Sequence, residues 1–235
     1  MKDEPRTNRS KLKQMDVITF DCYGTLIDWE SGIRDSFRKI MQRTGASPGL
    51  EDRAVQFYEE EERRVEREKP HQLYRQVLSK TALAVARRIG WTLSEKDSSF
   101  LAGDLPSWTP FNDTNPALQR LARDHVLGIL SNVDNDLLAG TMKQLAARFE
   151  ILVTAENVRS YKPKFAHFEK AHELIAGRSW VHVAGSQHYD IEPAATLGIR
   201  AIWVNRKGAS LLRNYPEDKV AQVKDLAELV DIVSS

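Results

Sequence analysis

The sequence predicts an α/β fold in which a parallel β-sheet core carries an inserted helical domain. Short apolar runs alternate with helical segments in the C-terminal half, as in a parallel sheet with crossover helices. One further β-rich run, Val17-Ile18-Thr19-Phe20, stands apart near the start and is followed by a long helical stretch rich in Glu and Arg. We therefore expect a core formed by residues 15–29 and 108–235, a helical cap at residues 30–107 and a flexible tail at residues 1–14.

The individual core elements follow from apolar periodicity along the chain. The expected strands after the cap are Val126 to Leu130, Ile151 to Thr154, Trp180 to Ala184 and Ala201 to Val204. The expected helices are Asn135 to Arg148, Lys164 to Ala176, Glu192 to Leu197 and a last one near Val223 to Val233.

Two patterns describe the predicted cap. Apolar residues from Leu73 to Ile89 recur at helical spacing and stop at Gly90, which predicts a helix whose apolar stripe packs into a core. The charged run from Glu59 to Lys69 offers opposite-charge pairs at three- and four-residue spacing. We interpret this run as the solvent-facing side of a helix rather than as a patch that reads substrate.

The composition bounds the class of protein. With 235 residues, of which 41% are hydrophobic, the chain can bury a sizeable core. Its 34 basic and 33 acidic residues nearly cancel, so bulk charge predicts neither a nucleic-acid partner nor a membrane surface. Cys22 is the only cysteine, which excludes an intrachain disulfide and favours a reducing, cytoplasmic location. No apolar run approaches the roughly 18–20 residues of a membrane-spanning helix.

Polar side chains follow four of the predicted strands. A carboxylate follows the first strand, in a turn that Gly24 permits, and the later strands are followed by a hydroxyl with an amide, an ammonium and a second carboxylate. Ligands of open α/β sheets bind at the carboxyl ends of the strands, so these side chains form a coherent candidate site. In strand order they are Asp21, Ser131 with Asn132, Lys162 and Asp190.

In this order the residues resemble the four motifs of the haloacid dehalogenase (HAD) superfamily, and the likeness covers almost the whole chain. The resemblance implies a Rossmann-like HAD core with an inserted cap, in which Asp21 is the nucleophile. It matches Lys162 to the third motif and Asp190 to the fourth. We expect Lys162 to hold down the pKa of Asp21, and Asp190 to hold or activate a hydrolytic water.

Tyr23 distinguishes between the activities of this superfamily. Superfamily phosphatases place a second aspartate two residues after the nucleophile to protonate the leaving group, and a tyrosine, with an unperturbed pKa of about 10, cannot replace it near neutral pH. The run Asp21-Cys22-Tyr23-Gly24-Thr25-Leu26 resembles the type II 2-haloacid dehalogenases, in which the aspartate attacks the carbon bearing halogen and water hydrolyses the resulting ester.

This resemblance implies a hydrolase whose partner is a small-molecule 2-substituted carboxylic acid. The residues to which it assigns catalysis are Asp21, Thr25, Lys162 and Asp190. Those to which we assign substrate binding are Tyr23, Ser131, Asn132, Gln187, Trp29 and Trp108. For the two tryptophans, packing between core and cap is an equally weighted interpretation.

Departures from the dehalogenase pattern keep other functions open. Gly185 stands where the pattern has serine, Phe168 stands where it has tyrosine, and the cap segment Gln56-Phe57-Tyr58-Glu59-Glu60 lacks the arginine that helps to bind halide. The chain is also similar to azetidine-2-carboxylate hydrolase, and a glutamate-rich cap suits a cationic amine better than a halide. The alternatives are a magnesium-dependent phosphatase of the same fold and a non-catalytic binding protein.

The same comparison bears on cofactors and assembly. Ser186 stands where many superfamily phosphatases carry the first of two aspartates, which leaves Asp21 and Asp190 as the evident carboxylate ligands. We therefore expect no required metal, with weak Mg²⁺ binding by this pair left open. The resemblance suggests a homodimer formed through the cap.

Overall fold

A parallel β-sheet forms the centre of the molecule. The computed structural model describes residue 12 and residues 15–47, 49–216 and 218–234. Six parallel strands lie in the order β3-β2-β1-β4-β5-β6, which confirms the predicted α/β class. They are β1 (Val17–Phe20), β2 (Val126–Ser131), β3 (Ile151–Thr154), β4 (Trp180–Ala184), β5 (Arg200–Val204) and β6 (Val220–Val223). The predicted tail at residues 1–14 lies outside the described residues apart from Leu12, whose side chain is buried.

The first strand rejoins the sheet across the helical insertion, as predicted. β1 pairs in parallel with β2 on one side and with β4 on the other, so it occupies the middle of the sheet. The carboxyl ends of β1, β2 and β4 therefore lie next to one another. This arrangement brings together the loops that carry Asp21, Ser131 and Asp190.

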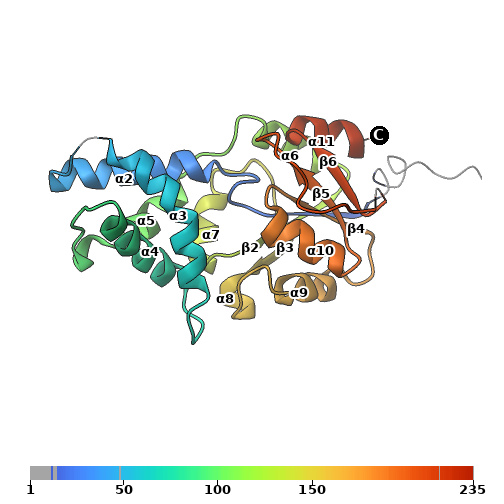
Figure 1. The fold of residues 1–235 in the computed structure, drawn as a ribbon. Helices are drawn as coiled ribbons and strands as arrows, with labels where there is room; N and C mark the ends of the chain where they lie inside the picture. The colour runs from blue at the N-terminus through green and yellow to red at the C-terminus, as the bar shows by residue number, and fades with distance from the viewer. Residues whose placement is uncertain (1–11, 13–14, 48, 217, 235) are drawn as a thin grey trace, which may run out of the picture.

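Helices cover both faces of the sheet (Figure 1). α6 (Thr114–Leu121) and α11 (Leu226–Val233) lie on one face, and α9 (Ala166–Ile175) and α10 (Glu192–Thr196) lie on the other. Side chains of a strand alternate between faces, so Phe20 packs in the cluster with α6 and α11, and Val17 packs in the cluster with α9 and α10. The remaining core helices are α7 (Asn135–Met142), α8 (Ala155–Val158) and the π-helical turn η3 (Gln187–Ile191).

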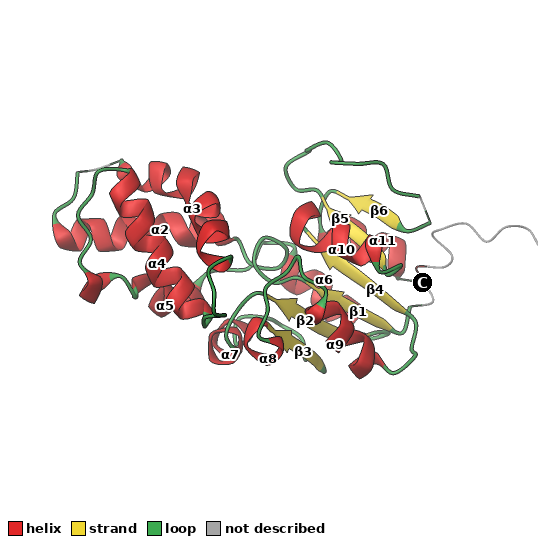
Figure 2. Cartoon of the chain, turned by 60° about the horizontal axis from the view of Figure 1, so that its bottom comes forward, coloured by secondary structure: helices red, strands yellow, loops and turns green. Residues whose placement is uncertain are grey.

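The segment between β1 and β2 contains the helical cap. Its elements are α2 (Trp29–Thr44), α3 (Leu50–Glu66), α4 (Tyr74–Arg88), η1 (Glu95–Asp97), α5 (Phe100–Asp104) and η2 (Leu105–Ser107). Figure 2 shows these helices grouped beside the sheet rather than on either of its faces. α4 buries Val77, Leu78 and Val85, which confirms the predicted packing stripe at these positions, and Gly90 follows with a φ of 75°. Leu73, the first residue of that stripe, is instead the exposed N-cap of the helix. No helix in the described ranges is long and apolar enough to cross a membrane.

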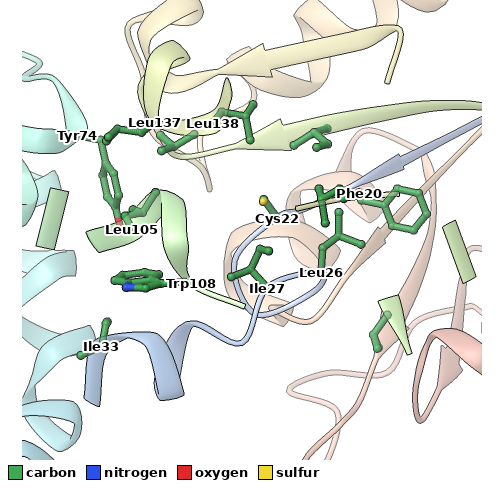
Figure 3. Packing of buried hydrophobic residues seen from close by; sticks show 14 of the residues in the cluster. Phe20, Cys22, Leu26, Ile27, Ile33, Tyr74, Leu105, Trp108, Leu137 and Leu138 are labelled. Atoms are coloured by element: carbon green, nitrogen blue, oxygen red, sulfur yellow. The ribbon is translucent and has the colours of Figure 1, made fainter. Parts of the chain in front are cut away.

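A continuous hydrophobic cluster joins the cap to the core. Figure 3 shows cap and η2 residues beside those of α7 and of the turn after β1, among them Tyr74, Leu105, Trp108, Leu137, Leu138 and Ile27. Asp134 adds a polar contact, because its buried carboxylate accepts hydrogen bonds from the N–H groups of Tyr74 at 2.6 Å and Arg75 at 3.1 Å. The core thus caps the N-terminus of α4.

Two of the predicted helices have different bounds in the structure. The helix expected from Asn135 to Arg148 stops at Met142, and Gln144 Nε2 instead donates to the carbonyls of Pro106 at 2.7 Å and Trp108 at 2.9 Å. The last helix begins at Leu226 rather than near Val223. Residues 220–223 form the edge strand β6, whose single fully buried side chain leaves little apolar alternation to detect.

Candidate active site

The turn after β1 presents Asp21 at the carboxyl end of the sheet. Gly24 has a φ of 95°, and the N–H groups of Leu26 and Ile27 donate to the Cys22 carbonyl at 2.8 and 3.0 Å, which closes the turn. The Thr25 hydroxyl, also in this turn, donates to Asp21 Oδ2 at 2.8 Å. One oxygen of the carboxylate is therefore oriented by the turn itself.

Lys162 links the two carboxylates that the sequence placed at separate strand ends. Its Nζ donates to Asp21 Oδ1 at 2.8 Å, to Asp190 Oδ1 at 2.6 Å and to the Leu130 carbonyl at 2.9 Å. An ammonium has three protons, so all of them are used. Asp21, Thr25, Lys162 and Asp190 are thus brought into one hydrogen-bonded group.

The charges of this group shift one another's pKa values. Burial opposes the charge of Lys162, but Asp190 and Asp21 outweigh it and raise the pKa of this lysine. Burial raises the pKa of Asp21, and Lys162 acts against that rise. Burial acts in the same direction on Asp190, but Lys162 and His182 outweigh it and lower the pKa of that carboxyl group. Asp190 is therefore the carboxylate more strongly held in its ionised form.

Ser131 and Asn132 have different positions at the end of β2. The Asn132 amide binds the backbone of Lys162, because Oδ1 accepts from its N–H at 2.7 Å and Nδ2 donates to its carbonyl at 3.1 Å. Ser131 is 1% exposed and lines the pocket, and its hydroxyl has no hydrogen-bond partner among the described residues. Asn132 thus fixes the lysine loop, whereas Ser131 is free to bind a ligand.

Two side chains expected to contact substrate are bound to protein groups instead. Gln187 Nε2 donates to the Ser210 carbonyl at 3.0 Å, and Gln187 Oε1 accepts from the Leu212 N–H at 2.7 Å. The Tyr23 hydroxyl lies 2.9 Å from Thr141 Oγ1. Both side chains line the pocket, but their polar atoms hold a neighbouring loop and α7 in place.

The group around Asp21 opens on a pocket of about 770 Å³ between the sheet and the cap. All the expected site residues line it except Thr25, which supports Asp21 by its hydrogen bond. Trp29 and Trp108 form part of the apolar wall and also pack between cap and core: Trp108 Nε1 donates to Ser36 Oγ at 3.1 Å, and the Trp29 ring lies 5.9 Å from the Tyr58 ring. The packing interpretation of the tryptophans is thus confirmed, and their contact with substrate stays a prediction.

The cap contributes two carboxyl groups that the sequence placed in a solvent-facing run. Glu62 and Glu66 lie one turn apart on α3, are half-buried and line the pocket. Burial raises the pKa of Glu62 to about 7, although the hydroxyls of Tyr58 and Tyr74 donate to its Oε1. Burial, together with Glu62, raises the pKa of Glu66 well above its ordinary value. The predicted solvated face is wrong for these two residues, and their four-residue spacing was the only signal in the sequence.

Two cap arginines also line the pocket, and each already has an acidic partner. Arg34 Nε lies 2.7 Å from Asp52 Oδ1. Arg63 pairs with Glu59, and its guanidinium lies 5.5 Å from the centre of a tyrosine ring in η3. A substrate carboxylate that reached either arginine would compete with an existing ion pair.

The carboxylate donors of the magnesium site implied by the superfamily's phosphatases are reduced here to Asp21 and Asp190. Mg²⁺ requires a near-octahedral shell of oxygen ligands. One oxygen of Asp21 and one of Asp190 face the Lys162 ammonium, and Ser186 Oγ accepts from the Tyr189 N–H at 3.1 Å. Across the described residues, no group of three or more His, Cys, Asp or Glu side chains is placed to hold a metal ion. Lys162 supplies the positive charge that faces both carboxylates.

Comparison with known proteins places this geometry in a family. The sequence matches the haloacid dehalogenase-like hydrolases over residues 15–198. It is 23% identical to haloacetate dehalogenase H-2 of Moraxella sp. (strain B), over 91% of this chain and 93% of that protein. The crystal structure of the L-2-haloacid dehalogenase PA0810 superposes with a TM-score of 0.75 at 26% identity, covering 92% of this chain and 97% of that one.

A further structural neighbour is the L-2-haloacid dehalogenase from Xanthobacter autotrophicus, solved with chloropropionic acid covalently bound. It has a TM-score of 0.77 at 18% identity, covering 93% of this chain and 98% of that one, and at this identity it shows the fold alone. The family match spans strands β1 to β4 and the cap, and includes all four loops that carry the polar residues of the site. The chain therefore belongs to the haloacid dehalogenase-like hydrolase family, and the protein is a hydrolase.

Proposed function

We propose that the protein hydrolyses a small 2-substituted carboxylic acid through an ester formed on Asp21. The observation that carries this proposal is the setting of Asp21, which faces the pocket while Lys162 and Thr25 each hold one of its oxygens. Tyr23 occupies the position of a phosphatase's second acid, and its hydroxyl is engaged with Thr141. The site thus has a fixed carboxylate nucleophile and favours a leaving group that departs without a proton from that position.

The proposed reaction has two steps. In the first, an oxygen of Asp21 attacks C2 of the substrate, the Asp21 O–C2 bond forms, and the leaving group departs with the electron pair of its bond to C2. In the second, water attacks the Asp21 carbonyl carbon and passes a proton to Asp190. The bond between the Asp21 carbonyl carbon and the substrate oxygen then breaks, and the departing oxygen takes up the proton held by Asp190. This releases a 2-hydroxy acid, restores both carboxylates and leaves one oxygen of water in Asp21.

The charge pattern supports a metal-independent version of this chemistry. Lys162 stabilises the ionised forms of both carboxylates, so the nucleophile does not depend on a divalent cation for its charge balance. Ser131 supplies an unengaged hydroxyl in the pocket that can donate to the substrate carboxylate. Glu62 and Glu66 make a substrate that carries an amine, such as a strained ring amino acid, the second candidate.

A panel of three substrates tests the proposal. Halide release from 2-chloropropionate and ring opening of azetidine-2-carboxylate are compared with phosphate release from p-nitrophenyl phosphate, each with and without Mg²⁺. We expect turnover of at least one of the first two without metal, and its loss in Asp21→Asn. Fast, magnesium-dependent phosphate release with neither of the other activities would refute the proposal.

Isotope labelling tests the ester directly. After turnover of the accepted substrate in oxygen-18 water, we expect mass spectrometry to find label in the peptide that contains Asp21. The matched control is Asp28, an aspartate at the end of the same turn, whose fragment ions in tandem mass spectrometry should carry no label. Turnover with no label at Asp21 would exclude the ester mechanism.

A further inference from the structure

A series of hydrogen bonds within the sheet links Trp180, Thr19 and His182 to the carboxylate of Asp190. Trp180 Nε1 lies 2.7 Å from Thr19 Oγ1, and Thr19 Oγ1 lies 2.8 Å from His182 Nδ1. His182 Nε2 then lies 3.1 Å from Asp190 Oδ1. Thr19 and His182 are fully buried on adjacent strands, β1 and β4, and neither lines the pocket.

The donors in this series determine where the protons lie. The Trp180 indole N–H can only donate, so Thr19 Oγ1 accepts from it. The hydroxyl proton of Thr19 then has one acceptor among the described residues, which is His182 Nδ1. Nδ1 therefore carries no proton, and the proton of the neutral imidazole is on Nε2, directed at Asp190. If Nδ1 carried a proton, the Thr19 hydroxyl proton would have no acceptor in this series of hydrogen bonds.

The two oxygens of Asp190 consequently have different environments. Oδ1 accepts from both Lys162 Nζ at 2.6 Å and His182 Nε2 at 3.1 Å. Oδ2 is buried in the pocket wall and has no donor among the described residues. Phe168 packs edge-on against the His182 ring, with ring centres 5.2 Å apart, and this contact restricts rotation of the imidazole.

We propose that Thr19 and His182 are positioning residues that hold Asp190 by Oδ1 and leave Oδ2 to accept the proton of the hydrolytic water. The proposal rests on the ester mechanism proposed above and concerns its second step. If the Thr19 hydroxyl is removed, His182 Nδ1 loses this donor and the imidazole is no longer held from that side. The ring can then tilt, which weakens the Nε2–H contact with Oδ1 and lets Asp190 leave its productive orientation.

Two substitutions at one position separate this role from simple packing. Thr19→Val has nearly the same shape and removes the hydroxyl, whereas Thr19→Ser keeps the hydroxyl and removes a methyl group. We expect Thr19→Val to slow ester hydrolysis by roughly 10- to 100-fold, the usual effect of losing an orienting contact of this kind. We expect Thr19→Ser to restore most of the rate.

The readout is accumulation of the ester after rapid mixing with 2-chloropropionate, followed by intact-protein mass spectrometry. We expect Thr19→Val to show a burst of ester on Asp21 followed by slow release of product, with little such burst in the wild type or Thr19→Ser. Equal ester lifetimes in Thr19→Val and the wild type would overturn the positioning role. If the wild type turns over no substrate of the panel, or turns one over in oxygen-18 water without labelling Asp21, the proposed function fails instead.

A second measurement needs no turnover. In wild-type protein with nitrogen-15 in its histidine rings, long-range proton–nitrogen spectra identify the tautomer of each ring, and the missing signal in His182→Gln assigns His182. We expect the neutral Nε2–H form at pH 7 in the wild type, and in Thr19→Val a shifted Nδ1 resonance, because that nitrogen has lost its hydrogen-bond donor. A wild-type ring protonated on Nδ1, alone or together with Nε2, would overturn the inference whatever the substrate.

Discussion

Gly185 lies directly against the backbone of Gly24, and a Cβ atom on Gly185 would come within 2.6 Å of the Gly24 carbonyl oxygen. The Gly185 N–H also donates to Thr25 Oγ1 at 2.9 Å, and the same hydroxyl orients Asp21. The loop that leads to Asp190 therefore touches the turn that carries Asp21 backbone to backbone. The missing side chain at Gly185, a departure from the dehalogenase pattern, is required by this contact.

We expect a serine at position 185, as in the dehalogenase pattern, to lower both the stability and the activity of this protein. In Gly185→Ser the new Cβ must push the Gly24 carbonyl away and disturb the hydrogen bond to Thr25. We expect the free energy of unfolding to fall by about 1–3 kcal/mol, measured by urea denaturation, and kcat to fall with it. Gly103→Ala is the matched control, because a Cβ there meets nothing within 4 Å. Wild-type stability and activity in Gly185→Ser would contradict the close contact.

Removing the buried ammonium should change the pH dependence of the reaction. Lys162→Met leaves Asp21 and Asp190 together without a counter-charge, so the pKa of Asp21 rises. We expect kcat/KM to fall at least about 10²-fold, and the acidic limb of its pH profile to move to higher pH. Destabilisation of about 3–5 kcal/mol should accompany this change. The exposed neighbour Lys164→Met serves as the control and should behave as the wild type.

Glu62 should make the protein less stable as the pH rises. Burial raises the pKa of Glu62 from 4.5 to about 7 in the folded protein, so the native state holds this proton more tightly than the unfolded chain does. The corresponding contribution to the free energy of unfolding is present in full below pH 4.5 and is lost as the pH rises to about 7. Glu62→Gln keeps an acceptor for the Tyr58 and Tyr74 hydroxyls and removes the titration.

We therefore expect Glu62→Gln to be more stable than the wild type at pH 8, by roughly 1–3 kcal/mol, with the difference shrinking toward pH 4.5. Thermal unfolding at a series of pH values measures this difference. Glu60→Gln, an exposed change on the same helix, should stay within about 0.5 kcal/mol at every pH. A stability difference that does not vary with pH would exclude a buried, titrating Glu62.

The contact between Asp134 and α4 should hold the cap on the core. Asp134→Ala removes the acceptor for the N–H groups of Tyr74 and Arg75, and we expect a loss of about 1–2 kcal/mol in urea unfolding. Hydrogen exchange should speed up in the first turn of α4. Asp136→Ala removes an exposed partner of the same Arg75 and should cost less than about 0.5 kcal/mol. Equal effects of the two changes would argue against a capping role for Asp134.

Local patterns were sufficient to predict most of the sheet. β1, β3 and β4 have the predicted bounds, because each is a short apolar run bounded by turn or helix signals. β6 was missed, since an edge strand with one buried side chain has almost no periodic pattern. The end of α7 was misplaced because Gln144 binds the carbonyls of Pro106 and Trp108. Both carbonyls lie far from Gln144 in the sequence, so no local pattern indicates the contact.

The polar residues of the site show the same division. Strand ends and their order located Asp21, Ser131, Lys162 and Asp190, because a parallel sheet gathers the carboxyl ends of its strands at one edge. Gln187 was expected to bind substrate, yet its amide is used by a loop that no local pattern connects to it. Position at a strand end is thus encoded locally, whereas the partner of each polar atom is not.

By itself the sequence determined the α/β class, the helical insertion and the strand-end location of Asp21, because these depend on apolar periodicity and turn residues within short segments. Only the tertiary structure decided which charges meet. It turned Glu62 and Glu66 toward the pocket and fixed Lys162 between two carboxylates. It also placed His182 beside Asp190 and in hydrogen-bond contact with Thr19, which is 163 residues from His182 in the sequence. Hydrogen bonds and ion pairs depend on distances across the fold, and those distances are set when the strands and the cap pack together.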